Sequence, residues 1–161
     1  MMIEALSLLR EKHASLFLLL VGDGPIREEL EDLTEQLGVR DRVIFTGFQN
    51  HPTDYLRAMD VFLLTSDTEG TSMTLLESMS IAKPAIATAV GGNCEIVRSG
   101  ETGVLINAGD AKALAETIEI LKNDPAKREA LGKQAYYRFV SLFSATTMAQ
   151  RYKALYDSGA G

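Results

Sequence analysis

The sequence predicts an α/β fold, in which helices cover both faces of a mostly parallel sheet. Short apolar runs alternate along the chain with segments whose apolar residues recur every three or four positions. The runs lack the polar alternation of a sheet with one wet face, as expected for strands buried on both sides. A chain of 161 residues suits one such domain. The five predicted strands are residues 16–21, 42–45, 61–64, 84–88 and 102–106.

Helix signals fill the intervals between the predicted strands. Apolar residues at positions 2, 5, 6 and 9 predict a helix before the first strand. Positions 26, 30, 33 and 37 form a second apolar helix face, with Pro25 in the first turn and Gly38 at the C-terminal cap. Thr71 or Ser72 is expected to cap a helix that ends near Ile81.

The C-terminal third is predicted to be mostly helical. A short helix opens at Gly92 or Asn93, and Asp110 caps a helix whose inward face holds positions 114, 118 and 121. Two more helices follow, one over residues 125–140 and one that opens at Ser144. The sequence has no evident linker or internal repeat, so residues 1–157 are expected to form one domain and residues 158–161 a frayed tail.

Charge and composition argue against several classes of function. Lys and Arg number 16 against 22 Asp and Glu, which gives a net charge of −6, and no basic block is present. Binding to nucleic acid or to an anionic membrane is therefore not expected. One cysteine, Cys94, forbids an internal disulfide and makes a poor zinc set with two histidines. We expect Cys94 to be a buried, inert thiol, and the absence of a membrane span or signal peptide favours the cytoplasm.

The predicted helix at residues 2–9 stands where a doubly wound sheet normally has its first strand. In the strand order 3-2-1-4-5-6 that first strand is central, so without it the ladder edges of two neighbouring strands are left unpaired. Each buried backbone group without a partner costs about 1–3 kcal/mol. We therefore expect one of three outcomes: the two edges pair directly, a strand enters from another chain, or the sequence is part of a longer protein.

Ligands bind open α/β sheets at the carboxyl ends of the strands, so the loops there form the candidate site. In the first loop, Gly22 and Gly24 allow a sharp turn and a close approach between a ligand and the backbone. A dinucleotide fingerprint needs a third glycine at position 27, which is occupied by Arg27. A nicotinamide or flavin site is therefore not predicted, and a plain strand-to-helix turn fits this loop equally well.

The loop after the third predicted strand carries the strongest functional signal. Residues 70–74 bring small side chains and free amides to a helix N-terminus, where the helix dipole favours a phosphate. Glu69 stands just before this helix and Glu77 lies inside it, so both carboxylates are expected to flank the phosphate in a shared hollow and to bind sugar hydroxyls. As a bare pair, two glutamates eight positions apart are more simply a solvated helix face, and the assignment depends on the surrounding motifs.

Six segments occur in an order and at a spacing typical of one enzyme family. They are VGDGP at 21–25, RVIFTGF at 42–48, EG at 69–70 with LLE at 75–77, VGG at 90–92, EIV at 95–97 and GETG at 100–103. Together they resemble family 4 of the retaining glycosyltransferases, which have the GT-B fold, and the similarity runs from about Leu6 to Tyr156. The resemblance implies a Rossmann-like, three-layer α/β/α domain that is the C-terminal, nucleotide-sugar-binding half of the enzyme. An N-terminal half would bind the acceptor.

The resemblance also implies roles for individual residues. Glu69 and Glu77 match the two ends of the family's E-x7-E motif: Glu69, the candidate catalytic residue, would contact the donor sugar, and Glu77 the ribose hydroxyls. Gly22 would line the floor of the pocket. Three residues would lie beside the diphosphate, namely Gly70, Thr71 and Thr74. Four residues would meet the nucleobase through their backbone, namely Thr46, Gly47, Phe48 and Gln49. The family's Arg and Lys that clamp the diphosphate would lie before Met1.

The function implied by this resemblance is transfer of a sugar from a nucleotide-diphosphate sugar, linked to UDP, GDP or ADP, with retention at the anomeric carbon. It implies no metal and no other cofactor. The chain alone is expected to bind donor weakly and to show no turnover. A strand-sharing homodimer is also consistent with the missing strand, and the absent half could touch the inner membrane face. Two alternatives stay open, a nucleotide-sugar epimerase of the same fold and a non-catalytic binding or scaffold module.

Overall fold

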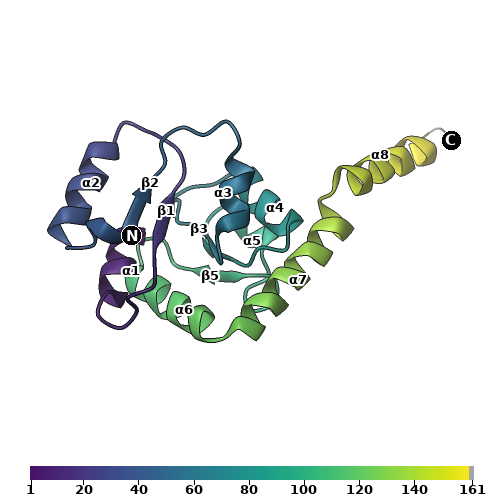
Figure 1. Ribbon diagram of the computed structural model, residues 1–161. Coiled ribbons are helices and arrows are strands. Elements are labelled where there is room, and N and C mark those ends of the chain that lie inside the picture. The colour runs from purple at the N-terminus through teal and green to yellow at the C-terminus, as the bar shows by residue number, and fades with distance from the viewer. Residues whose placement is uncertain (160–161) are drawn as a thin grey trace.

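The computed structural model describes residues 1–159 and has the predicted α/β architecture (Figure 1). The five predicted strands are confirmed, each slightly shorter than expected: β1 (Leu18–Leu20), β2 (Val43–Phe45), β3 (Phe62–Leu64), β4 (Ala85–Thr88) and β5 (Val104–Ile106). The helices are α1 (Met2–Leu9), α2 (Arg27–Gln36), α3 (Pro52–Ala58), α4 (Met73–Ser80), α5 (Asn93–Ile96), α6 (Ala111–Asn123), α7 (Pro125–Leu142) and α8 (Ala145–Gly159), with a 3-10 turn η1 (Arg40–Arg42). Of the expected tail, residues 158–159 continue α8, and residues 160–161 lie outside the described part.

The N-terminal end of α2 differs from the prediction. The helix begins at Arg27, so Pro25 lies before it rather than in its first turn. Ile26 is the N-cap residue and is 53% exposed, so it does not belong to the buried helix face. Helix α3 was not predicted, because its seven residues bury only Leu56 and are too short to show a repeating apolar face.

The C-terminal end of α2 is confirmed at Gly38. This residue has φ of +64°, the left-handed conformation that glycine adopts without steric cost. Its amide donates to the carbonyl of Glu35 at 3.0 Å, and the amide of Val39 donates to the carbonyl of Thr34 at 2.9 Å. These two hydrogen bonds form a Schellman motif, which satisfies carbonyls that the end of a helix leaves unpaired.

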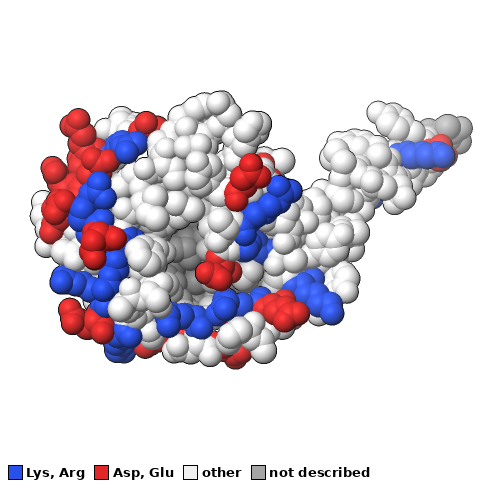
Figure 2. All heavy atoms as spheres, in the orientation of Figure 1, with Lys and Arg blue, Asp and Glu red and all other residues white. Residues whose placement is uncertain are grey.

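The strands form two separate parallel sheets instead of one. One sheet has the order β1-β2 and the other β3-β4-β5, and a slot of about 610 Å³ lies between β1 and β3. Its two long sides are residues 16–21 and 58–63, and Met2, Leu6 and Ile118 contribute from α1 and α6. In the space-filling view a recess lies near the middle of the molecule (Figure 2). Of the three outcomes expected for a missing central strand, direct pairing of the edges is therefore wrong.

The burial of the strands reflects the slot. All four residues of β4, which has neighbours on both sides, are buried. By contrast, all three residues of β3 and two of the three in β1 are only half-buried, although every one of them is apolar. Within residues 1–159, β1 and β3 each have a ladder partner on one side only, and the edge that faces the slot is unpaired.

Helices cover both faces of the three-stranded sheet. The side chains of β4 alternate between the two faces, as the pleat of a strand requires. Ile86 packs with buried residues of α1 and α6, whereas Ala85 and Ala87 pack with buried residues of α4 and α5. Helix α7 reaches both layers, because Leu131 belongs to the first cluster and Ala135 to the second. The arrangement is the three-layer α/β/α sandwich that was predicted.

Helix α8 leaves the body of the molecule and projects outward (Figure 1). Ser144 caps it as predicted, because its Oγ accepts the amide hydrogen of Thr147 at 3.2 Å. The apolar positions of its predicted face, Met148, Tyr152 and Leu155, are each more than half exposed. Within residues 1–159, no helix has both the length and the apolar composition needed to cross a bilayer.

Candidate functional site

The loop after β3 holds Glu69 close to the body of the protein. The hydroxyl of Ser66 donates to Glu69 Oε1 at 2.7 Å, and both side chains are half-buried. The Ser66 carbonyl in turn accepts a hydrogen bond from the hydroxyl of Thr88 at 2.6 Å. Glu69 is therefore not a freely solvated carboxylate, which was the simplest alternative for this residue.

The loop after β4 packs directly on the Glu69 loop. A β-carbon at Gly91 would lie 1.7 Å from the Glu69 carbonyl oxygen, and one at Gly92 would lie 2.1 Å from the Gly70 carbonyl oxygen. The Gly92 amide donates to the Gly70 carbonyl at 3.1 Å. Glycine is therefore needed at both positions, because the backbones of the two loops are in direct contact and side chains would prevent that contact.

The N-terminus of α4 is open and presents free donors. Ser72 is the N-cap, as one of the two predicted options, and its Oγ accepts the Leu75 amide hydrogen at 3.3 Å. The amides of Met73 and Thr74 have no acceptor within the described residues, as expected for the first turn of a helix. Gly70, Thr71 and Thr74 are exposed. The structure therefore places the predicted diphosphate residues around an unblocked helix N-terminus.

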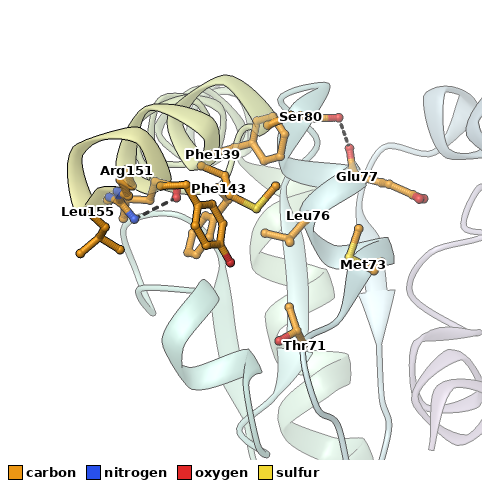
Figure 3. A pocket seen from close by; sticks show the side chains of 13 residues that line it. Thr71, Met73, Leu76, Glu77, Ser80, Phe139, Phe143, Arg151 and Leu155 are labelled. Carbon is orange, nitrogen blue, oxygen red and sulfur yellow. Dashed lines mark hydrogen bonds between the residues drawn. The ribbon is translucent and has the colours of Figure 1, made fainter. Parts of the chain in front are cut away.

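Glu77 borders a groove that Glu69 does not line. Thr71 and Glu77 border an apolar groove of about 740 Å³ between α4, α7 and α8, and Glu69 is not among its lining residues. The exposed Glu77 side chain extends away from Phe139 and Phe143 of that groove (Figure 3). The shared hollow expected for the two carboxylates therefore stays a prediction.

The loops after β1 and β2 form a second cluster. The amide of Gly22 donates to the carbonyl of Gly47 at 3.1 Å, and both glycines have positive φ values, +126° and +68°. Gln49 Nε2 donates to the Thr46 carbonyl at 2.8 Å, which closes the second loop on itself. Phe48 is 76% exposed. The predicted nucleobase segment is thus held next to Gly22, as a group at the carboxyl end of the β1-β2 sheet.

The two clusters follow different sheets. The first comprises the loops around Glu69 and Gly91, and the second comprises those around Gly22 and Gly47. Within residues 1–159, no hydrogen bond joins the two clusters. The residues predicted from the sequence are therefore gathered into two well-built groups rather than one closed pocket.

Three side chains that support the site were not predicted. Ser66 and Thr88 were assigned no role because the sequence does not show that their loops touch. Asn93 was noted only as a helix start, yet it is fully buried, and its Nδ2 donates to the Thr88 carbonyl at 3.0 Å. Its Oδ1 has no hydrogen-bond partner in the structure. The prediction of a buried Cys94 is wrong. Cys94 follows Asn93 in α5, and its side chain is exposed.

Residues 1–159 contain no group of three His, Cys, Asp or Glu side chains placed to hold a metal ion. The free amides of Met73 and Thr74 and the positive end of the α4 dipole are placed to attract an anion.

Comparison with known proteins identifies the family. The sequence model of the glycosyl transferases group 1 matches residues 1–138. The chain belongs to this family. It is 37% identical over 143 residues to the lipopolysaccharide core biosynthesis glycosyltransferase LpsD of Rhizobium meliloti, which covers 89% of this chain and 42% of LpsD. It is 35% identical over 140 residues to the N-acetyl-alpha-D-glucosaminyl L-malate synthase of Bacillus anthracis, which covers 86% of this chain and 36% of that protein.

Solved glycosyltransferase structures have the same fold. Anabaena Alr3699/HepE in complex with UDP superposes with a TM-score of 0.89 at 27% identity, over 98% of this chain and 44% of that one. The C-terminal domain of the glycosyl transferase group 1 protein LpcC from Francisella tularensis superposes with a TM-score of 0.82 at 25% identity, over 89% of this chain and 77% of that domain. This glycosyltransferase-family chain thus has the Rossmann-like fold of one half of a GT-B enzyme and spans less than half of the curated relatives it matches.

Proposed function

We propose that this chain is the donor-binding domain of a retaining glycosyltransferase that takes a sugar from a nucleotide-diphosphate sugar. The observation that carries the proposal is the juxtaposition of Glu69, held by Ser66, with the open N-terminus of α4. A helix N-terminus attracts phosphate, and an anchored carboxylate beside it accepts sugar hydroxyls. Structures of HepE with UDP and with UDP-glucose, whose fold this chain shares, support the same class of ligand.

The proposal gives each cluster a part of the ligand. The diphosphate lies over Gly70, Thr71 and Thr74, with the ribose at Glu77 and the sugar at Glu69. The base lies against the backbone of Thr46 to Gln49, above Gly22. The exposed, unpaired amides of Met73 and Thr74 support the diphosphate position, since a phosphate oxygen is the acceptor they lack.

The proposed chemistry is substitution at the anomeric carbon with retention. As the bond from the sugar to the diphosphate breaks, negative charge grows on the departing diphosphate, and donors that are already oriented stabilise that charge. No side chain of the site is assigned as a nucleophile. The proposal includes no metal or other cofactor, and EDTA is expected to leave nucleotide affinity unchanged.

The other half of the active site belongs to an N-terminal domain in the proposed parent enzyme. The chain covers only about two fifths of LpsD, and the groove that Glu77 borders is not lined by Glu69. Such a domain would bind the acceptor, and the Arg and Lys expected before Met1 would complete the diphosphate site. On this account the chain alone shows no turnover.

The slot between β1 and β3 supports the expectation of a supplied strand. Its unpaired edges would be satisfied by a strand from a longer chain or by strand sharing in a homodimer. Light scattering after gel filtration separates the two: a concentration-dependent dimer favours sharing, and a strict monomer favours a longer chain. We place the protein in the cytoplasm, a compartment that suits the single, exposed thiol of Cys94.

Titration with UDP, GDP and ADP tests the proposed function. The wild-type chain is expected to bind one of the three, and Glu77→Ala to weaken that binding about tenfold, the value of a hydrogen bond to a charged group. Glu116→Ala, which removes an exposed glutamate of α6, is the control and should have no effect. Equal, weak affinities for wild type and Glu77→Ala would favour the non-catalytic module.

The reaction product distinguishes an epimerase from a transferase. Incubation of the full-length parent enzyme with its donor alone would isomerise the sugar if the protein is an epimerase. A transferase would leave the sugar configuration unchanged until an acceptor is added.

A further inference from the structure

The carboxylate of Glu69 is oriented from one side only. Oε1 accepts the hydrogen bond from Ser66 at 2.7 Å, while Oε2 accepts none within the described part of the chain. A carboxylate has lone pairs on both oxygens, so the pairing of Oε1 leaves Oε2 available to a ligand hydroxyl. The Ser66 hydroxyl thus decides which oxygen is free.

Ser66 is itself anchored to the core. Thr88, the last residue of the central strand β4, is fully buried, and its hydroxyl donates to the Ser66 carbonyl at 2.6 Å. The carbonyl of Thr88 accepts Nδ2 of the buried Asn93 at 3.0 Å. A chain of three hydrogen bonds therefore runs from the core, through residues of three different segments, to the Glu69 carboxylate.

The backbone of the Glu69 loop is fixed independently. The Gly92 amide donates to the Gly70 carbonyl, and the close approach of Gly91 to the Glu69 carbonyl leaves no room for the loop to move inward. These contacts hold the main chain but not the carboxylate. Among the described residues, only Ser66 binds the carboxylate of Glu69.

We propose that Ser66 is a positioning residue, which holds the Glu69 carboxylate in the orientation that binds the donor sugar. The inference rests on the proposed function, because it assigns the sugar to Glu69. A glutamate that is already ordered loses less conformational freedom when the ligand binds, and this gain applies to the sugar but not to the nucleotide. Ser66 therefore sets the difference in affinity between a nucleotide sugar and its bare nucleotide.

Calorimetric titration with paired ligands tests this difference. The pairs are UDP with UDP-glucose, GDP with GDP-mannose and ADP with ADP-glucose, and the pair that the wild-type chain binds is used for the variants. Ser66→Ala is expected to weaken nucleotide-sugar binding about tenfold while nucleotide binding stays within about twofold. Ser66→Thr, which keeps the hydroxyl, should restore the wild-type ratio.

Two further variants show whether the effect passes through Glu69. In a Glu69→Ala background, Ser66→Ala should cause no additional loss of sugar binding, since the group it orients is gone. Ser7→Ala is the matched control, because it removes a hydrogen bond of the same 2.7 Å length, from the Ser7 hydroxyl to the Glu4 carbonyl on α1. It should leave both affinities unchanged.

The result that overturns the inference is an unchanged ratio of the two affinities in Ser66→Ala. A wild-type chain that binds no nucleotide would instead overturn the proposed function. In that case the orienting role is measured without ligand, through NMR scalar couplings that report the Glu69 χ1 angle. Wild type should show one rotamer and Ser66→Ala an average of several, and an averaged wild type would refute the role of Ser66.

Discussion

The α-carbon of Gly91 lies against the carbonyl of Glu69, so closely that a β-carbon would come within 1.7 Å of the carbonyl oxygen. Gly91 also has φ of +45°, a conformation that residues other than glycine rarely adopt. The loops after β3 and β4 are therefore one structural unit. Any change at position 91 must be transmitted to Glu69.

Gly91→Ala is expected to lower the free energy of unfolding by about 1–3 kcal/mol, from strain in the backbone and the contact with Glu69. Denaturant unfolding measures the loss. Gly24→Ala is the control, because a β-carbon there meets no atom within 4 Å, and it should change stability by less than about 0.5 kcal/mol. Equal stability of Gly91→Ala and wild type would mean that the two loops are not in contact.

The N-cap of α4 is expected to affect both stability and ligand binding. Ser72→Ala removes the acceptor for the Leu75 amide and should cost about 1 kcal/mol of unfolding free energy. It should also weaken nucleotide binding, because the first turn of α4 frays. Asp110→Ala removes a similar cap, 2.8 Å from the Ala113 amide, at the start of α6. It should cost similar stability but leave the nucleotide affinity as in wild type, and a parallel loss of affinity would contradict the site.

Ala82→Gly is expected to stabilise the protein by roughly 0.5–1 kcal/mol. Ala82 follows α4 with φ of +56°, and its amide and that of Lys83 donate to the carbonyls of Met79 and Ser78, as in a Schellman motif. Glycine adopts this conformation without the steric cost that alanine has. Thermal unfolding measures the gain.

The neighbouring Gly132 gives the opposite control for Ala82. A β-carbon at this position of α7 would lie 2.0 Å from the Ala82 carbonyl oxygen. Gly132→Ala should therefore lower the melting temperature, whereas Ala82→Gly should raise it. A destabilised Ala82→Gly protein would show that Ala82 is not strained.

Acid should weaken a contact between the α1–β1 loop and α6. Glu119 Oε1 lies 3.1 Å from His13 Nε2, and its second oxygen lies 3.4 Å from Lys12 Nζ. The hydrogen bond from His13, helped by the charge of Lys12, lowers the pKa of Glu119 below its ordinary 4.5, against a smaller opposing effect of desolvation. The ionised carboxylate therefore stabilises the folded state above pH 4.5, and this stability is lost as pH falls through the folded pKa.

The measurement is unfolding free energy against pH for wild type and Glu119→Gln. Wild type should lose more stability than the variant between about pH 5 and pH 3, because the variant has no carboxylate to protonate. Glu116→Gln, on the same helix with only a 3.9 Å contact to Lys112, should follow the wild-type curve. Parallel curves for wild type and Glu119→Gln would contradict the lowered pKa.

Local features of the fold were predictable from the sequence. The left-handed cap at Gly38, the side-chain caps at Ser72 and Asp110, and the apolar strands follow from residue types within a few positions of each other. Two local features were not predicted correctly, the start of α2 and the presence of α3. Pro25 lies before α2, and α3 is too short for a repeating apolar face.

The candidate site was predictable only in part. The spacing of Glu69 and Glu77 on either side of a helix start was visible in the sequence, as were the glycines at 91 and 92. In the sequence those glycines were only part of a motif and a possible helix start, whereas in the structure they let one loop pack directly on another. Ser66 and Thr88 gave no signal at all.

The sequence by itself determined the strands, most of the helices and their caps, and the family of this protein, because each depends on residue type and order along the chain. Only the tertiary structure decided that the sheet is divided by a slot, that Glu69 is held by Ser66, and that Cys94 is exposed. These properties depend on which segments meet in space. Contacts between residues some twenty positions apart, such as Ser66 and Thr88, form only when the strands β3 and β4 pair and bring their carboxyl ends together.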